Sequence, residues 1–332
     1  MKNNFFKSKG SIVLLLAVAF ATLSWGIVGH ERINKAAILA LPKPMLIFFY
    51  NHNDFITQEA SVPDIRKYAL KYKEENPRHY FDMENFGSLD SIPQNLTAAN
   101  AKYDAKFLSN NGILPWYIEE MMGKLTQAFK DKNRAEILFL SADLGHYIAD
   151  AHMPLHTSAN HDGQLSDQKG IHSLWESKLP EMFSKNYQLN VPQAQYYENV
   201  HQAIWDMIND THSLVAPLLE VDKKLRTATP ENQVFKMDSE GKVLKSKYNS
   251  AVFSDEYAKQ LHQQLNGMVE NQMKKAITAT SSFWYTAWVN AGKPDLSDLD
   301  APELTKRNSK ALKHDLKLFA NGKLFGFKSQ ND

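Results

Sequence analysis

The chain has 332 residues, with 38 lysines and arginines against 37 aspartates and glutamates, and no cysteine. Hydrophobic residues make up 43% and charged residues 23%, which excludes a disordered chain and a disulfide-stapled mini-protein. The balanced charge gives no indication of a broad basic surface for nucleic acid, although a bound metal could supply positive charge at one site.

The N-terminal residues have the pattern of an export signal. Three lysines and no acidic residue occupy the first nine positions, and an apolar run follows over residues 12–21. Thr22 and Ser24 stand three and one positions before Trp25, which predicts a signal peptide over residues 1–24. An uncleaved membrane anchor is the alternative, but the run is about half the ~20 residues that a span needs. We therefore expect an exported protein, periplasmic or secreted, with no transmembrane segment after cleavage.

Cleavage would change the charge balance. Without the three lysines of the signal, 35 basic residues stand against 37 acidic ones in a mature chain of 308 residues, a net charge of about −2. Since no disulfide can form, an exported protein of this sequence must draw its stability from its core or from metal ions.

The mature chain has the periodicity of helices. Apolar residues recur at helical spacing from Glu31 onward, and no linker divides two cores. The pattern predicts one all-α domain over residues 25–305, mostly helical. The clearest predicted helices cover residues 116–130, 134–151, 171–183, 198–226 and 255–290.

Two segments depart from that pattern. Residues 233–245 alternate around a turn-like Asp238-Ser-Glu-Gly241, which predicts a small β-hairpin inserted between helices. Residues 306–332 are basic and weakly patterned, and we expect them to form a loosely docked C-terminal tail.

The histidines cluster, with five of the twelve between positions 146 and 172. His146 and Asp150 are four residues apart, as are His172 and Glu176, so each pair shares a helix face. One such pair alone is better explained by a surface hydrogen bond. Two pairs within 31 residues favour a metal site, because zinc takes imidazole nitrogen and carboxylate oxygen as ligands.

Further candidate ligands stand around these pairs. Pro154 ends the helix of the first pair, and His156 falls just past that end, where it could turn toward a second metal. Upstream lie His30, Asp64 and His79. Taken singly, each of these three is more often a structural or a solvated residue.

Together these motifs resemble the superfamily of zinc-dependent phospholipases C and S1/P1 nucleases. The resemblance covers Trp25 to Glu176, about half of the mature chain, in the order of that superfamily. The matching motifs are Trp25-Gly-x-x-Gly-His30, Pro63-Asp64, His79-Tyr-Phe-Asp82, His146-x-x-x-Asp150-x-His-Met-Pro-Leu-His156 and His172-Ser-Leu-Trp-Glu176.

The resemblance implies a mostly helical domain that holds three zinc ions in a cleft. The nine implied ligands form three sets: Asp64, His79, His146 and Asp150; His156, His172 and Glu176; and the amino group and carbonyl of Trp25 with His30 and a bridging oxygen of Asp150. Since a free α-amine is a ligand in this superfamily, signal cleavage before Trp25 would complete the third set.

The chemistry implied is hydrolysis of a phosphodiester. Paired zinc ions neutralise the phosphate and lower the pKa of a water molecule. The carboxylate of Asp64 is the candidate catalytic base that orients or deprotonates this water. Histidines bind metal only when neutral, so activity should fall in acid.

The motifs divide on whether the substrate is phospholipid or single-stranded nucleic acid. Glu176 as the last ligand resembles the phospholipase branch, whereas nucleases usually have aspartate there. The five-residue step from Trp25 to His30 resembles the nuclease branch. Val28 occupies the place of a glutamate that contacts choline in phospholipases, which puts choline specificity in doubt.

Substrate contacts follow from the same resemblance. Tyr80 and Asp82 match an aromatic residue and an aspartate that contact a flipped-out base in nucleases. Arg66, with Lys67, could hold a phosphate, and Asn160 lies in a loop that could line the cleft.

We therefore expect first an exported, zinc-dependent, phospholipase C-like phosphodiesterase. The main alternative is an S1/P1-type nuclease acting on single-stranded nucleic acid. A third is a non-enzymatic exported zinc-binding protein, which the complete ligand set disfavours. No stable protein partner is implied.

Overall fold

The computed structural model describes residues 26–88, 91–246, 249–299 and 303–323, so the predicted signal peptide and Trp25 lie outside the described residues. The described chain is mostly helical and forms no sheet, as predicted. Of the helices in these ranges, none combines the length and the apolar composition that a membrane crossing requires.

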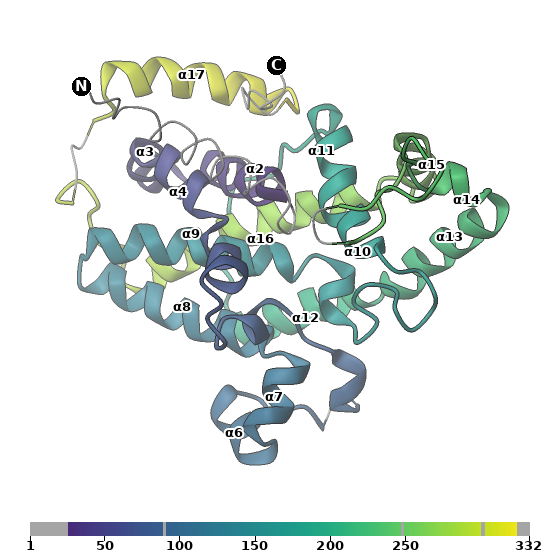
Figure 1. Ribbon diagram of the computed structural model, residues 1–332. Helices are drawn as coiled ribbons and strands as arrows, with labels where there is room; N and C mark the ends of the chain where they lie inside the picture. Colours follow the sequence, from purple (N-terminus) through teal and green to yellow (C-terminus); the bar gives the residue numbers. More distant parts are fainter. Residues whose placement is uncertain (1–25, 89–90, 247–248, 300–302, 324–332) are drawn as a thin grey trace, which may run out of the picture.

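Many of the helices are joined by short connections, and longer ones follow residues 157, 186, 234 and 290 (Figure 1). In chain order they are α2 (Gly26–Leu39), α3 (Lys43–Asn51), α4 (Asn53–Glu59), α5 (Val62–Asp64), η1 (Ile65–Ala69), η2 (Asn76–His79), η3 (Met83–Phe86), α6 (Leu96–Lys102), α7 (Ala105–Asn111), α8 (Leu114–Lys130), α9 (Arg134–Asp150), η5 (Pro154–Thr157), α10 (Ile171–Ser173), η6 (Leu174–Lys178), α11 (Leu179–Phe183), η7 (Ser184–Asn186), α12 (Val200–His212), α13 (Val215–Ala228), α14 (Glu231–Val234), α15 (Asp255–Gln264), α16 (Met268–Asn290) and α17 (Lys306–Ala320). The segments η1 and η6 are π-helical, and the other η segments are 3-10 helices.

The two most regular predicted helices are confirmed as α8 and α9. Asn133 begins α9, because its side chain accepts a hydrogen bond from the backbone N–H of Glu136. The two longest predicted helices are each divided. The first breaks into α12 and α13, and the second breaks before α16 at Gly267, whose φ of 80° no ordinary helix contains.

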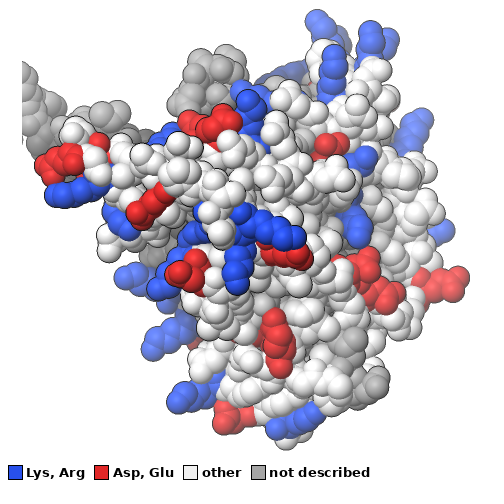
Figure 2. All heavy atoms as spheres, turned by 90° about the vertical axis from the view of Figure 1, so that its right-hand side faces the viewer, with Lys and Arg blue, Asp and Glu red and all other residues white. Residues whose placement is uncertain are grey.

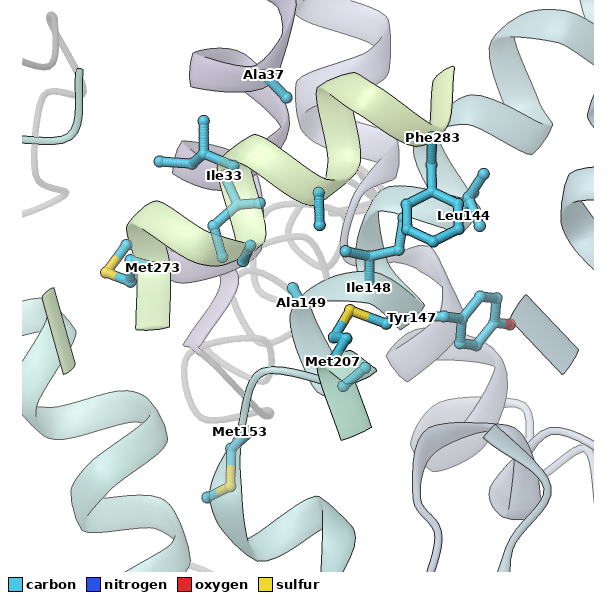
Figure 3. Close-up of a cluster of buried hydrophobic side chains, with 14 of the residues drawn as sticks. Ile33, Ala37, Leu144, Tyr147, Ile148, Ala149, Met153, Met207, Met273 and Phe283 are labelled. Atoms are coloured by element: carbon cyan, nitrogen blue, oxygen red, sulfur yellow. The ribbon is translucent and has the colours of Figure 1, made fainter. Parts of the chain in front are cut away.

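The core forms where α2, α8, α9 and α16 pack against one another. Figure 3 shows Ile33 of α2, Leu144 and Ile148 of α9 and Phe283 of α16 pointing into one apolar cluster, and all four are buried. Full burial of one such side chain contributes about 1.5–3 kcal/mol. The helix that carries His146 and Asp150 is therefore held on its apolar face by the centre of the bundle.

The predicted β-hairpin is not formed as a pair of strands in the part of the chain that the structure describes. The described residues 234–246 and 249–254 instead lie as three paired segments, and the backbone of Lys236 bonds to both Leu244 and Val252. Turns follow each other so closely that pairing is limited to isolated antiparallel bridges, Phe235 with Phe253, Met237 with Val243 and Lys245 with Ala251.

The described part of the expected C-terminal tail is a packed helix rather than a loose segment. Leu312 and Phe319 of α17 are buried, and Tyr50 donates a 2.7 Å hydrogen bond to the carboxylate of Asp315. Figure 1 shows α17 lying over α2 and α3. Leu312, Leu316 and Phe319 are four and three residues apart and share one face of α17, so the amphipathic pattern of a docked helix is present in the sequence, contrary to the expectation of a weakly patterned segment.

The surface charge is mixed, as the composition predicts. On the face drawn in Figure 2, basic and acidic side chains are interspersed rather than separated. Attraction of a polyanion to this face as a whole is therefore weak, and anion binding depends on local sites.

A close approach of α2 and α9 sets the position of the first histidine pair. The buried amide of Asn34 on α2 donates to the carbonyl oxygens of Ile56 and Ala142, at 3.2 and 3.1 Å. A Cβ atom at Gly145 would lie 2.0 Å from Asn34 Oδ1. Only glycine therefore allows this contact, which brings His30 of α2 over the ring of His146.

We expect Gly145→Ala to lower the free energy of unfolding by about 1–3 kcal/mol, because the added methyl group overpacks the α2–α9 contact. Gly123→Ala on the exposed face of α8 is the matched control, since nothing lies within 4 Å of its Cβ position. That control should gain about 0.5–1 kcal/mol. Urea denaturation of the two variants measures both changes, and equal stabilities would contradict the close-packing account.

Candidate metal centre

Eight of the nine predicted ligands converge at one place in the fold, and the ninth, Trp25, lies outside the described residues. They come from α2, α5, η2, α9, η5, α10 and η6: His30, Asp64, His79, His146, Asp150, His156, His172 and Glu176. All are buried except His172, which is partly exposed. Asp64 and Glu176 stand at or in π-helical turns, a feature often found at functional sites.

The first group forms around the end of α9. His79 Nδ1 lies 3.1 Å from His146 Nε2 and 2.9 Å from Asp150 Oδ2. His146 Nε2 lies 3.3 Å from the same Asp150 oxygen, and Asp64 Oδ1 lies 3.8 Å from His79 Nδ1. Four potential ligand atoms thus surround one point.

The second group forms between η5 and the turn α10–η6. His156 Nε2 lies 3.3 Å from His172 Nε2, and Glu176 brings one oxygen to each ring, at 3.6 and 2.8 Å. His156 lies in η5, shortly after the end of α9 at Asp150, so a short segment of chain joins the two groups.

Asp150 connects the two groups and His30. Its Oδ2 faces His79 and His146, while its Oδ1 lies 3.6 Å from both His30 Nε2 and His156 Nδ1. His30 stacks on His146 with ring centroids 3.9 Å apart. A carboxylate with its two oxygens aimed at different sets of imidazoles has the geometry of a bridging ligand.

The first described residue, Gly26, lies beside the second group. The backbone N–H of Gly26, the residue after Trp25, donates a 3.3 Å hydrogen bond to Ser177 Oγ, next to Glu176. A Cβ atom at Gly26 would lie 2.9 Å from Glu181 Oε1.

The hydrogen bonds around the groups show that the residues fit divalent cations. His146 Nδ1 must donate to the carbonyl of Ala60, and His172 Nδ1 to the carbonyl of His161, both at 2.8 Å. In the neutral rings, both Nε2 lone pairs therefore face carboxylate oxygens. Three further buried atoms have no hydrogen-bond partner among the described residues: Asp64 Oδ1, Asp150 Oδ1 and His156 Nδ1. A cation bound by nitrogen and oxygen satisfies these atoms together.

The site is strongly ionised. Burial opposes a charge on Asp150, but His146 and His156 hold the pKa of this carboxyl well below its usual range. Burial also opposes ionisation of Glu176, yet His156 and His172 lower its pKa to about 2. Burial lowers the pKa of His156 to about 4, which keeps this ring neutral and able to bind metal.

A cleft of about 460 Å³ opens onto the second group. Its walls come from the segment after Asp64, the residues around η2, the loop before α10 and the bridged segment that contains Ser250. The chain also has a larger hollow, about 720 Å³, between α12, α16 and residues 190–199. None of the eight predicted ligands lines that hollow, so it is separate from the metal groups.

Comparison with known families identifies the chain. A sequence profile described as S1/P1 Nuclease matches residues 25–288, which is most of the chain and contains the whole ligand set. The protein belongs to the S1/P1 nuclease family. It is therefore a hydrolase acting on phosphoester bonds, in a family that depends on zinc. A comparison with curated proteins gave no match.

Membership of the S1/P1 nuclease family corrects the functional prediction. The sequence motifs favour a phospholipase C-like enzyme because of Glu176, but the family match supports the alternative, a nuclease, better. Glutamate and aspartate both bind a metal through a carboxylate and differ only in side-chain length. The residue at position 176 is therefore a poor indicator of the substrate.

The cleft contains two of the four predicted substrate residues. Tyr80 and Asp82 line it, next to His156. The Asn160 side chain is instead used within its own loop, where it bonds to Ser166 Oγ and the backbone N–H of Leu165.

Arg66 does not line the cleft either. Its guanidinium donates to Glu75 Oε2 at 3.1 Å and to Asp143 Oδ2 at 2.5 Å, behind the first group. The neighbouring Lys67 lines the cleft, because successive side chains of the π-helical turn after Asp64 point in different directions around its axis. Both cations adjoin Asp64 in the sequence, and only the fold distinguishes them.

Glu75, which no motif in the sequence indicates, supports His79 from outside the first group. This buried carboxylate lies 3.5 Å from His79 Nε2, accepts a hydrogen bond from Tyr147, and pairs with Arg66 and Arg78 at 3.1 and 3.0 Å. Burial opposes its charge, but these neighbours lower the pKa of Glu75 to about 2. A carboxylate behind a metal-binding histidine fixes the ring and directs the other nitrogen toward the metal.

We expect Glu75→Gln to weaken zinc binding by about 10–100-fold, because the neutral amide holds His79 less firmly in place. Competition with a chromophoric chelator measures this change on the purified, folded protein. Glu220→Gln, which removes an exposed carboxylate paired with Lys224 on α13, is the matched control and should bind zinc normally. Wild-type zinc affinity in a folded Glu75→Gln protein would rule out the supporting role.

Proposed function

We propose that the protein is an exported, zinc-dependent nuclease that hydrolyses phosphodiester bonds in single-stranded nucleic acid. The observation that carries this choice is the family match, which spans all nine predicted ligands. The convergence of eight of these residues, with Asp150 between the groups, supports a phosphodiesterase centre of that family.

The metal content proposed is three zinc ions. Asp64, His79, His146 and Asp150 would hold one, and His156, His172 and Glu176 a second. His30 and Asp150 would hold the third, with the amino group and carbonyl of Trp25. The family match begins at residue 25, and this supports a mature protein that starts at Trp25 after signal cleavage and is periplasmic or secreted.

The proposed mechanism assigns the proton transfer to Asp64. Bound zinc would supply the positive charge that neutralises the phosphate and acidifies a water molecule. Burial raises the pKa of Asp64 more than the nearby His146 and His79 lower it, so its carboxylate is a stronger proton acceptor than a solvated aspartate. Lys67 at the cleft wall would pair with a non-bridging phosphate oxygen, the role expected of Arg66.

Base recognition is proposed for Tyr80 and Asp82. The ring of Tyr80 lines the cleft, and its hydroxyl is held by a 3.0 Å hydrogen bond to the carbonyl of Ser109. The backbone of Tyr80 also passes close to Gly112. Only glycine fits there, since its φ is 84° and a Cβ atom would lie 1.9 Å from the Tyr80 carbonyl oxygen. Asp82 is buried, and its Oδ1 has no hydrogen-bond partner among the described residues. A base edge could satisfy this oxygen.

A phospholipase C-like activity is the second candidate, and Glu176 is the feature that favours it. A non-enzymatic zinc-binding role fits the protein least, because every described ligand position holds a metal-binding side chain.

The deciding experiment is a paired assay of the mature protein beginning at Trp25, loaded with zinc. One sample contains single-stranded DNA or RNA, and the other contains mixed phosphatidylcholine and phosphatidylethanolamine micelles. We expect release of nucleotides and no diacylglycerol. Diacylglycerol alone would reverse the choice in favour of the phospholipase, and neither product from a zinc-loaded protein would leave the enzymatic proposal without support.

Asp82→Asn tests the base site through pH. Burial, with the nearby Glu84, raises the pKa of Asp82 to about 7. An aspartate in the unfolded chain ionises near pH ~4, so the free energy of unfolding of the wild type falls as pH rises from about 4 to 7. The neutral amide of Asp82→Asn removes this loss of stability. The melting temperature of Asp82→Asn relative to wild type should therefore increase between pH 5 and pH 8.5, while kcat/KM for nucleic acid falls.

A melting difference independent of pH would show that the Asp82 carboxylate is not destabilised by burial. An unchanged kcat/KM would remove Asp82 from the substrate contacts.

A further inference from the structure

The segment between the metal ligands Asp64 and His79 contains a surface loop with an unusual set of side chains. Residues 67–73, here called the tyrosine loop, read Lys67-Tyr-Ala-Leu-Lys-Tyr-Lys73. Tyr68, Leu70 and Tyr72 are 44%, 54% and 53% exposed, although large apolar side chains are usually covered. Neither the metal groups nor the core accounts for these side chains.

The backbone of this loop is well anchored. Leu70 N–H bonds to the carbonyl of Ile65, and Tyr72 N–H bonds to that of Arg66, both at 3.0 Å. The ion pair of Arg66 with Glu75 closes the loop at its base. Because Glu75 also supports His79, the position of the loop is tied to the metal centre.

One end of the loop enters the cleft. Lys67 and Tyr68 line it together with Asn76 and Tyr80, whereas Leu70, Tyr72 and the lysines at 71 and 73 are exposed on the surface. The loop is therefore a strip that leads from the reaction site to solvent.

We propose that the tyrosine loop binds the nucleotides next to the cleaved phosphodiester, with Tyr72 stacking on a base and Lys71 and Lys73 pairing with phosphates. This inference rests on the proposed nuclease function. Aromatic rings interleaved with lysines hold single strands without sequence preference, since every base has a flat face and every nucleotide a phosphate.

The local charge favours a polyanion. Lys67, Lys71 and Lys73 stand against one exposed acidic residue of the adjoining segment, Glu74, because Glu75 is buried in its ion pairs. Exposed tyrosines and lysines can also contact an anionic membrane. The family match favours nucleic acid over lipid as the occupant, and the experiment below tests the membrane directly.

The test compares a single-stranded oligonucleotide of about 20 nucleotides with a dinucleotide, which is too short to reach the outer part of the loop. We expect Tyr72→Ala to reduce the ratio of kcat/KM for the long substrate to that for the short one by about tenfold, as expected for the loss of one stacked base. Tyr72→Phe keeps the ring and should restore the ratio.

The lysines are tested by salt. In the Lys71→Gln/Lys73→Gln protein, the slope of log KM for the long substrate against log salt concentration should fall by about 1.4, because two phosphate contacts are lost. Tyr196→Ala, an equally exposed tyrosine beside the other hollow, and Lys313→Gln/Lys317→Gln on α17 are the matched controls. Both controls should keep the wild-type ratio and slope.

The outcomes separate this proposal from the one on which it rests. If wild type cleaves both substrates but Tyr72→Ala keeps the wild-type ratio, the loop is not a binding element and the nuclease proposal stands. If wild type cleaves neither, both proposals fail. Binding of wild type to phosphatidylglycerol vesicles that Tyr72→Ala abolishes, with an unchanged substrate ratio, would assign the loop to a membrane instead.

Discussion

A buried carboxylate surrounded by four imidazoles is the arrangement on which the rest of the site depends. Asp150 is fully buried, and its two oxygens face different histidines. A charge in such a place is costly unless it is paired, and these histidines must be neutral to serve as ligands. Divalent cations bound by these residues would resolve this conflict. Bound metal would then stabilise this concentration of polar groups at the centre of a helical bundle.

Residues outside the predicted ligand set hold these groups in place. The carbonyls of Ala60 and His161 fix two rings by their Nδ1 atoms, and Glu75 lies behind a third ring. The close contact at Gly145 brings α2 against α9, so that His30 stacks on His146. The site is thus built on packed helices, whereas the cleft walls that would select a substrate come from turns and loops.

Much of this site is local in the sequence. Spacing of four on a helix joins His146 to Asp150 and His172 to Glu176, and Pro154 predicts the turn that carries His156. The motif order led to the right superfamily. It placed a phospholipase before a nuclease, whereas the family match favours the nuclease, because that order rested on Glu176, whose carboxylate would serve a metal as an aspartate would. Likewise, Arg66 and Lys67 are adjacent cations, and the π-helical turn sends only Lys67 to the cleft.

The sequence by itself determined the all-helical class, the positions of α8 and α9 to within two residues and the identity of the candidate ligands, because periodicity, caps and motif spacing are local properties of a chain. Only the tertiary structure decided that Glu75 supports His79, that Asn160 is used within its own loop and that the tyrosine loop stays exposed beside the cleft. Those outcomes depend on which distant surfaces meet when the bundle closes, and no spacing along the chain records them.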